Sequence, residues 1–311
     1  MSPTLSRLDA VLLCVLTLIW GVNWPVMKIG VATFPPFTFR AVTLLGGLAV
    51  IAVIARAQGH SLGVDRRWWR ETAVLSLTNM AAWYALSILG VRLLASGRAA
   101  ILGYTLPVWV ALIGFVVYRE RQGPRLVVAL VAASIGVGLL LSSEVRAIAG
   151  SPIGTACMLV SAAIWALGTH QLRRRSQPTP LVVLSFWMMA GAFLVCAVLS
   201  AAFEHHLWVR WPNAAEWGAI VYNILLAYGV AQLLWFRLAS GLPPVVSALS
   251  VMMIPVVGVV SGLVLLGERP GWTDAVALVA ILVAIGATLI PPRSTAPATA
   301  AQPYRFWKSR R

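Results

Sequence analysis

The sequence predicts an all-α integral membrane protein whose ten transmembrane helices form two inverted repeats of five helices. Three observations support this prediction: a strongly apolar composition, ten apolar stretches of membrane-spanning length, and an internal repeat with a period near 145 residues. Because each repeat holds an odd number of helices, the second repeat must cross the bilayer upside down relative to the first.

The composition places the chain in a lipid bilayer. Hydrophobic residues make up 60% of its 311 residues, charged residues make up only 11%, and the mean hydropathy is +0.86. A soluble domain could neither bury so much apolar surface nor cover it with so few charges. The net charge of +15 could suggest nucleic acid, but the basic residues lie mainly between the apolar stretches. In that position they orient a membrane protein, so we expect a lipid bilayer partner and no nucleic acid.

The apolar stretches have the length of membrane-spanning helices, about 20 residues for a hydrocarbon core of roughly 30 Å. In chain order they lie near 10–31, 36–56, 70–91, 96–118, 125–142, 152–172, 180–203, 215–236, 243–266 and 273–291. The first stretch has a weakly basic start and no small-residue cleavage site, and its Ile-Trp dipeptide recurs in the second half. We therefore interpret it as a retained helix and not as a signal peptide.

An internal repeat relates the two halves of the chain. When Pro107 is aligned with Pro255, residues 107–141 match their counterparts at 14 of 35 positions. The matches include a Glu-Arg-x-Gly segment that begins at Glu120 and again at Glu268. Upstream, Leu-Ala-Ser-Gly recurs at a shift of 144 and Ile-Trp at a shift of 145. A period of this length predicts two homologous halves.

The repeat and the basic residues together predict the organisation of the chain. We expect a first five-helix repeat over 1–146, a second, inverted repeat over 147–292 and a disordered, basic cytoplasmic tail over 293–311. With the N-terminus placed inside, the loops on the cytoplasmic side hold 17 Lys and Arg residues and those on the other side hold 6. This asymmetry follows the positive-inside rule and predicts that both termini are cytoplasmic.

Several motifs resemble one superfamily of transporters. Ile-Trp-Gly-x-Asn occupies 19–23, Pro35, Pro36 and Arg40 open the second stretch, and a Pro...Glu-Arg pattern ends the fourth and the ninth. Over 8–291 these features resemble the drug/metabolite transporter superfamily, EamA-type, and the aromatic-rich stretches resemble its aromatic amino acid exporters. The resemblance implies a basket-shaped bundle in the bacterial inner membrane that exports metabolites or drugs by alternating access. It also implies a central cavity lined by the first, third, fourth, sixth, eighth and ninth stretches.

The sequence offers no constellation suited to catalysis. All nine acidic residues fall in loops or near the ends of the apolar stretches, so no membrane-embedded pair of carboxylates could run hydrolysis. Neither lysine follows the glycines of a phosphate-binding loop, and the four histidines include no His-x-x-x-His pair. We expect a monomeric transporter that is not an enzyme and needs no cofactor or metal. A channel and a membrane-embedded enzyme are the alternatives from other classes.

Polar and aromatic residues recur at helical spacing inside the apolar stretches. In the third stretch Ser76, Asn79, Trp83 and Ser87 lie on one predicted face, which suits a polar pathway better than lipid. The alternative for each residue is a hydrogen bond that holds neighbouring helices together. The predicted substrate pathway comprises Trp20, Asn23, Trp24, Asn79, Trp83, Tyr84, Tyr104, Trp165, Tyr228, Gln232 and Ser250.

This set of side chains favours one kind of solute. Trp and Tyr rings combined with uncharged Asn, Gln and Ser groups suit a neutral or zwitterionic molecule with an aromatic or apolar body. Aromatic and other neutral amino acids fit this description, so we expect a small-molecule exporter or facilitator for them. Flat organic cations, such as methyl viologen-like drugs, could bind the ring faces by cation–π attraction, and a multidrug exporter is the alternative.

Four residues have open interpretations. Pro107 and Pro255 lie mid-span at equivalent positions and are expected to kink their helices, either as gating hinges or as static bends. His170 is the candidate for proton coupling, but the basic cluster 173–175 disfavours its protonated form and favours uniport or exchange. Arg40, one turn into its stretch, is expected either to snorkel to the outer interface or to have a structural or gating role.

Overall fold

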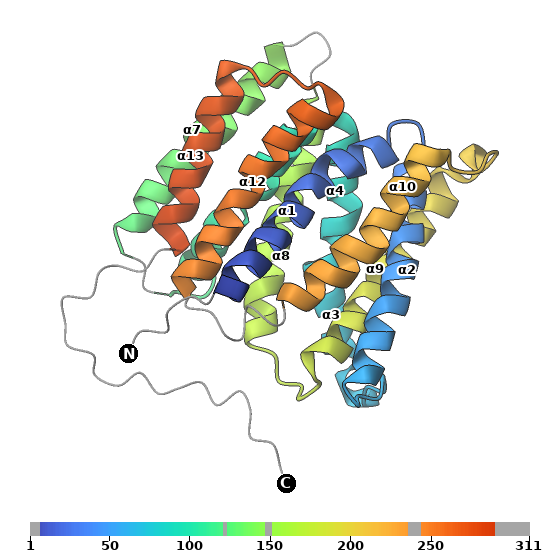
Figure 1. Ribbon diagram of the computed structural model, residues 1–311. Helices are drawn as coiled ribbons and strands as arrows, with labels where there is room; N and C mark the ends of the chain where they lie inside the picture. The colour runs from blue at the N-terminus through green and yellow to red at the C-terminus, as the bar shows by residue number, and fades with distance from the viewer. Residues whose placement is uncertain (1–6, 121–122, 147–150, 236–243, 290–311) are drawn as a thin grey trace.

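The computed structural model describes residues 7–120, 123–146, 151–235 and 244–289 (Figure 1). The described part contains eight spans long and apolar enough to cross a bilayer, and the last two helices add shorter apolar segments. The prediction of an all-α membrane protein with ten spans is confirmed. In chain order the helices are α1 (Arg7–Gly30), α2 (Pro36–Ala57), η1 (Arg66–Trp68), α3 (Trp69–Ser76), η2 (Leu77–Ala81), α4 (Ala82–Leu93), α5 (Ser96–Gly103), α6 (Leu106–Val116), α7 (Arg125–Arg146), α8 (Pro152–Arg173), α9 (Leu181–Phe203), η3 (His205–Leu207), α10 (Ala214–Tyr222), η4 (Asn223–Val230), α12 (Pro244–Leu266) and α13 (Trp272–Leu289).

The two halves run in opposite directions through the bundle. α1 ends beside the end of α4, where Lys28 Nζ donates to two carbonyl oxygens, both at 2.7 Å. α8, the counterpart of α1, begins at the same place, because Gly154 lies against Leu94. Equivalent helices therefore point in opposite directions, as an inverted repeat requires. We name this end of the bundle the Glu268 end, and the opposite end, where α8 finishes, the Glu120 end.

Helix packing repeats across the two halves. α1 packs on α12 and α10, and its counterpart α8 packs on α5, α6 and α4. α2 packs on η4, and its counterpart α9 packs on η2. Two pairs of equivalent helices pack on each other, α2 with α9 and α7 with α13, which lie side by side in Figure 1. The helices are thus arranged about a pseudo-two-fold axis.

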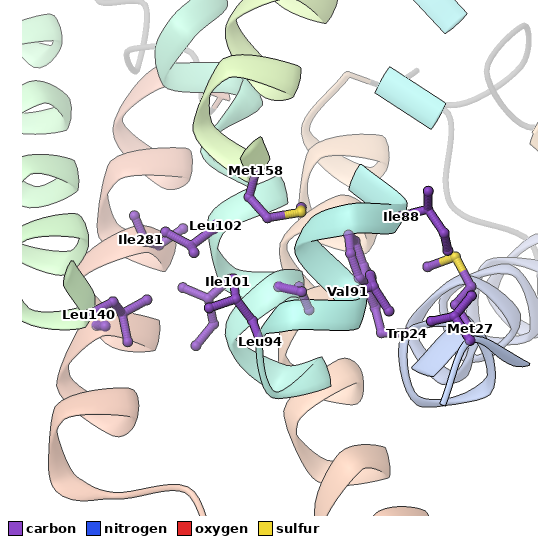
Figure 2. Close-up of a cluster of buried hydrophobic side chains, with 14 of the residues drawn as sticks. Trp24, Met27, Ile88, Val91, Leu94, Ile101, Leu102, Leu140, Met158 and Ile281 are labelled. Atoms are coloured by element: carbon purple, nitrogen blue, oxygen red, sulfur yellow. The ribbon is translucent and has the colours of Figure 1, made fainter. Parts of the chain in front are cut away.

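The largest apolar cluster of the described residues joins both repeats. Its completely buried members include Ile101 of α5, Leu140 of α7, Met158 of α8 and Ile281 of α13 (Figure 2). Because side chains from both halves interdigitate here, the cluster holds the repeats against each other by dispersion contacts. This packing provides the rigid frame for the polar groups of the bundle.

Two π-helical segments lie at equivalent positions in the third and eighth spans. η2 contains Asn79 and η4 contains Asn223, which are buried and related by a shift of 144. Each Nδ2 donates at 3.0 Å to the carbonyl oxygen four residues earlier, that of Leu75 or Ala219. A π segment changes the backbone partners of such carbonyls, so the asparagine amides satisfy groups that lipid could not.

Polar residues of the third span divide between two neighbouring helices. Ser76 Oγ donates to the carbonyl oxygen of Met188 in α9 at 2.8 Å. Asn79 lies against Gly168 of α8, and Trp83 also faces α8. Ser76 therefore follows the alternative interpretation, a hydrogen bond that holds two helices together.

The fourth span is broken into two helices. α5 and α6 are separated by Tyr104 and Thr105, just before Pro107. The Thr105 hydroxyl donates to the carbonyl oxygen of Leu102 at 2.6 Å, which satisfies part of the interrupted backbone. In the second repeat α12 continues through Pro255 without a break. The break lies before Pro107, and the predicted role of either proline as a hinge or a static bend stays a prediction.

Carboxylates from the second repeat cap helices of the first repeat at the Glu268 end. Glu268 accepts hydrogen bonds from the backbone N–H groups of Ser96 (2.6 Å) and Gly97 (3.2 Å) at the start of α5. Glu204 accepts from the N–H groups of Phe37 (3.0 Å) and Thr38 (2.8 Å) at the start of α2. A carboxylate at a helix N-terminus satisfies unpaired N–H groups and interacts favourably with the helix dipole. The repeats are therefore fastened to each other at this end.

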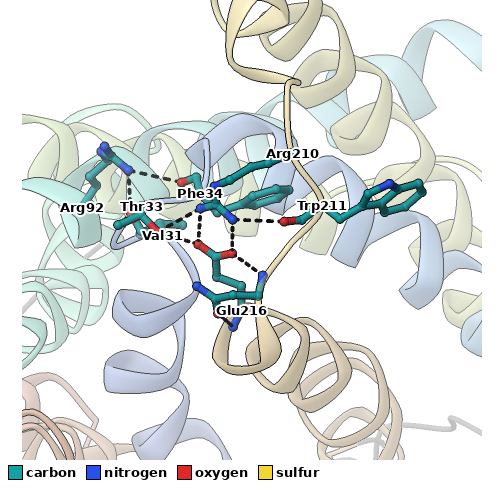
Figure 3. A network of polar contacts seen from close by, with 8 residues as sticks. Val31, Thr33, Phe34, Arg92, Arg210, Trp211 and Glu216 are labelled. Atoms are coloured by element: carbon teal, nitrogen blue, oxygen red, sulfur yellow. Dashed lines mark hydrogen bonds and ion pairs between the residues drawn. The ribbon is translucent and has the colours of Figure 1, made fainter.

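A third contact between the repeats involves an arginine (Figure 3). Glu216 accepts from both terminal nitrogens of Arg210 and from the Thr33 hydroxyl, all at 2.7 Å. Hydrogen bonding to Glu216 raises the pKa of Arg210 above its ordinary value. Arg92 Nη1 donates to carbonyl oxygens of the α1–α2 loop beside this network. The connection between α1 and α2 is thus held by charged side chains of α4 and of the second repeat.

Glu204→Ala is expected to lower the apparent melting temperature in detergent by about 5 °C or more, because buried N–H groups lose their acceptor. Glu204 is 5% exposed and caps a membrane-spanning helix. The control is Asp65→Ala, since Asp65 caps only the short η1 and its side chain is 56% exposed. We expect Asp65→Ala to leave the apparent melting temperature essentially unchanged. Equal melting temperatures for the two variants would contradict this account of α2.

Candidate functional site

Four of the predicted pathway residues form a cluster of rings, Trp24, Trp83, Tyr104 and Trp165, which we name the aromatic cluster. The Trp24 and Trp83 centroids are 6.5 Å apart in an edge-to-face arrangement, and Trp24 and Tyr104 are 6.3 Å apart. Trp83 also packs on Trp165, with centroids 4.6 Å apart. A Cβ atom at Gly103 would come within 2.9 Å of Trp24, so this glycine lets the rings approach α5 closely. The cluster joins α1, α4, α8 and the α5–α6 connection.

A second pair of rings lies at equivalent positions of the two repeats. Tyr84 and Tyr228 are related by a shift of 144, and their centroids are 5.8 Å apart in an edge-to-face arrangement. Residues at equivalent positions meet only near the pseudo-two-fold axis, so this pair marks the middle of the interface between the repeats. The Leu-Ala-Ser-Gly segments show the same shift of 144, so the equivalence of Tyr84 and Tyr228 could have been predicted from the sequence but was not.

Arg40 points into this tyrosine pair and not towards the membrane surface. Its Nη1 donates to the Tyr228 hydroxyl at 3.0 Å, and its Cζ lies 5.1 Å from the Tyr84 ring centroid. Nη2 donates to the sulfur of Met27 at 3.0 Å. The residue is only 2% exposed, so the expectation that Arg40 snorkels to the interface is wrong. Its contacts come from α1, α4 and η4, which bury the side chain inside the bundle. We name Arg40, Tyr84, Tyr228 and Met27 the arginine site.

Asn23 supplies an unpaired acceptor beside the aromatic cluster. Its Oδ1 is buried and has no hydrogen-bond partner among the residues that the structure describes. Asn23 precedes Trp24 in the chain and lies one helical turn from Met27, on the same face of α1. A buried acceptor without a donor costs about 1–3 kcal/mol, so this oxygen suits a donor that arrives with a ligand.

The other predicted pathway residues lie in different surroundings. Trp20 packs on Trp235 with centroids 5.7 Å apart, in an apolar cluster separate from Trp24. Asn79 uses its amide nitrogen to bond its own helix. Gln232 is half-buried and lies one turn after Tyr228. Ser250 belongs to α12, but its side chain lies outside the described residues.

His170 lies in a polar cluster at the Glu120 end. Its Nε2 is 2.8 Å from the carbonyl oxygen of Val110, which can only accept, so Nε2 is the donor in this contact. Its Nδ1 is 3.7 Å from Glu120 Oε1, and its ring stacks on Tyr118 with centroids 4.7 Å apart. Arg174 bonds the same carboxylate oxygen at 3.1 Å. Glu120 was not among the predicted site residues, although its equivalence to Glu268 in the repeat indicated a matching position at each end of the bundle.

A cleft of about 510 Å³ opens at the Glu268 end between α1, α10 and α12. Its walls include both charged and apolar groups: Lys28, Ile29, Ala32, Thr33, Asn213, Ala215, Glu216, Leu266 and Glu268. Within the described ranges no group of three or more His, Cys, Asp or Glu residues is placed to hold a metal ion. The described residues offer ring stacking in the aromatic cluster, the charge of Arg40 in the arginine site and charged walls in this cleft.

The sequence is similar to those of known transporters. The model of the EamA-like transporter family matches the chain twice, at residues 8–142 and 152–290. The chain is 24% identical over 254 residues to the "Uncharacterized transporter YoaV" of Bacillus subtilis, covering 81% of this chain and 87% of that protein. It is 26% identical over 278 residues to a "Probable amino-acid metabolite efflux pump" of Salmonella typhimurium, covering 85% and 89%.

Structure comparison agrees on the fold. A solved structure, titled only "Crystal structure of protein", superposes with a TM-score of 0.62 at 21% sequence identity. The match covers 90% of this chain and 95% of that one, so the two proteins share the fold over most of their length. Together with the two family matches, which cover most of the chain, these similarities show that the protein is a multi-pass membrane transporter and belongs to the EamA-like transporter family.

Proposed function

We propose that the protein exports aromatic and other neutral amino acids by alternating access, through a pathway between the two repeats. The observation that carries the proposal is the aromatic cluster, in which Trp24, Trp83 and Trp165 meet where α1, α4 and α8 converge. A contact between two aromatic rings contributes only about 0.5–1.5 kcal/mol beyond area burial, so the ring of a bound solute could replace one of these contacts with a similar one. The unpaired Asn23 Oδ1 supports a substrate that carries a hydrogen-bond donor. The name of the Salmonella relative supports amino acid metabolites as the substrate class.

The same proposal covers the oligomeric state, the location and the orientation of the protein. The transporter acts as a monomer in the inner membrane of a bacterium, with both termini in the cytoplasm and repeats over 1–146 and 147–292. In this orientation the Glu268 end faces outward, and the cleft lined by Lys28 and Glu216 is the outer vestibule. The protein moves solutes without chemical change and needs no cofactor.

A competition panel tests the substrate class. The purified protein is reconstituted in liposomes, and flux of labelled tryptophan is measured with an excess of unlabelled amino acids or of cationic dyes. We expect phenylalanine, tyrosine and leucine to inhibit the flux and methyl viologen to leave it unchanged. Inhibition by cationic dyes alone would overturn the proposal in favour of a multidrug exporter, which the rings could also serve through cation–π attraction.

We further propose that the substrate moves down its own gradient, by uniport or exchange. His170 is 1% exposed, bonded to a backbone carbonyl and stacked on Tyr118, an arrangement that fixes the ring. Efflux from liposomes is therefore expected to be the same, within about twofold, with and without an imposed pH gradient. His170→Ala is expected to retain downhill flux. Uphill accumulation that requires the pH gradient and disappears in His170→Ala would make this histidine the coupling site.

A further inference from the structure

We infer that Arg40 recognises a carboxylate group on the transported solute. The inference rests on the proposed function in one respect, since it needs a solute that enters the bundle between the repeats. It goes further by naming the chemical group that the site selects and the residue that selects it.

The first argument is the charge of Arg40. The side chain is 2% exposed, and its three contacts, the Tyr228 hydroxyl, the Met27 sulfur and the Tyr84 ring, are all neutral. In the described part of the chain no carboxylate lies within ion-pair distance of the guanidinium. Burying an unpaired charge in a membrane protein is costly, and such residues usually mark a pathway or a ligand. The arginine site thus lacks an anion.

The second argument is the number of unused donors. A guanidinium carries five N–H groups, and the two hydrogen bonds of Arg40 occupy one on Nη1 and one on Nη2. Nε is buried and has no partner among the described residues. Nε–H and a neighbouring Nη–H form a planar fork that matches the two oxygens of a carboxylate. A neutral hydrogen-bonding ligand would satisfy the fork but not the charge.

The third argument is the position of Arg40 relative to the proposed pathway. Tyr84 is the chain neighbour of Trp83 in the aromatic cluster, and Met27 lies one turn along α1 from Asn23, about 6 Å in helix rise. A zwitterion placed here could offer its carboxylate to Arg40 and its ammonium group to the unpaired Asn23 Oδ1. Its apolar body would then lie towards the rings.

The fourth argument is the asymmetry of the site. The tyrosines are equivalent in the two repeats, but the starts of α2 and α9 are related by a shift of 145, which pairs Arg40 with the neutral Ser185. Within the described residues, the tyrosine pair near the axis therefore receives a positive charge from the first repeat and none from the equivalent position of the second. That charge gives a bound solute one preferred orientation, and it repels organic cations from the same position.

The test measures binding, so it does not depend on transport. The melting temperature of the purified protein is recorded with phenylalanine, 3-phenylpropionate, phenylalaninamide or 2-phenylethylamine at equal concentrations. We expect both carboxylates to stabilise the wild type and to bind about tenfold or more tightly than the amide and the amine, a factor that a charge-assisted hydrogen bond can supply. Equal binding of acid and amide, or no shift with either carboxylate, would overturn the inference.

Two substitutions assign the effect to this residue. Arg40→Gln is expected to lose the preference for carboxylates, and Arg40→Lys to keep it at lower affinity, because lysine keeps the charge without the fork. The matched control is Arg56→Gln, an exposed arginine in the last turn of the same helix, which should bind like the wild type. A folded Arg40→Gln variant that retains the preference would overturn the inference. If Arg40→Gln does not fold, the inference is tested by whether the wild type prefers carboxylates and whether Arg40→Lys keeps that preference at lower affinity.

The outcomes separate this inference from the proposed function. Binding of 3-phenylpropionate that depends on Arg40, without transport of amino acids, would support the carboxylate site and overturn amino acid export. Transport of phenylalanine with no preference over phenylalaninamide would support amino acid transport and overturn the role of Arg40.

Discussion

Trp83→Ala is expected to reduce the transport efficiency for aromatic substrates by roughly 10- to 100-fold, since two ring contacts of about 0.5–1.5 kcal/mol each are lost together with the stacking surface. Trp83 contacts Trp24 on one side and Trp165 on the other, so it is the ring that joins α1 to α8 through α4. Initial flux into liposomes at several substrate concentrations measures the effect, and Trp83→Phe should restore part of it.

The control for this variant is Trp217→Ala. Trp217 lies on α10 with 42% of its surface exposed, away from the aromatic cluster. We expect its flux to stay within about twofold of the wild type. A Trp83→Ala protein that folds and transports as well as Trp217→Ala would show that the aromatic cluster is packing and not pathway.

Glu268→Ala is expected to shift the protein towards an open state in which the start of α5 has separated from the second repeat at the Glu268 end. Glu268 accepts from Ser96 N–H, Gly97 N–H and the Ser96 hydroxyl, and the loss of this shared acceptor costs about 3 kcal/mol or more. A change of that size alters an equilibrium between closed and open states by about 100-fold. A cysteine placed at the completely buried Ala99 of α5 should then react faster with a thiol reagent.

Labelling requires a background without native thiols, so the free cysteines Cys14, Cys157 and Cys196 are replaced first. Glu120→Ala provides the matched control, because Glu120 is the repeat counterpart of Glu268 and lies at the other end of the bundle. It should not increase labelling at Ala99. Equal labelling in the wild type and in Glu268→Ala would contradict the view that this carboxylate holds the two repeats together.

The ten spans and their inversion were predictable because apolar length and repeat register are properties of the linear sequence. The third span shows where such reasoning ends. Its helical spacing placed Ser76 and Trp83 on one face, but η2 lies between them. A π segment adds a residue within the turn and alters the helical register of the residues after it. Helix propensity does not predict such a π segment. The equivalence of η2 and η4 becomes visible only in the structure, where Asn79 and Asn223 each bond their own helix.

Part of the candidate site could also be predicted. Four residues chosen for type and spacing do meet in the aromatic cluster, whereas Trp20, chosen by the same rule, packs on Trp235 instead. The burial of Arg40 could not be predicted from the sequence because it depends on the direction of the side chain. A residue one turn inside a span reaches either the interface or the bundle, and the tyrosines that receive Arg40 come from spans 44 and 188 residues away in sequence.

The central claim, that a solute passes between two repeats that open alternately, is tested most directly by the concentration dependence of tryptophan flux into liposomes. We predict that the initial rate saturates with external tryptophan and that unlabelled tryptophan inside the liposomes accelerates the entry of labelled substrate, because each return of a loaded carrier restores the binding site. A rate that rises linearly without saturation and does not respond to internal substrate would contradict alternating access and identify a channel.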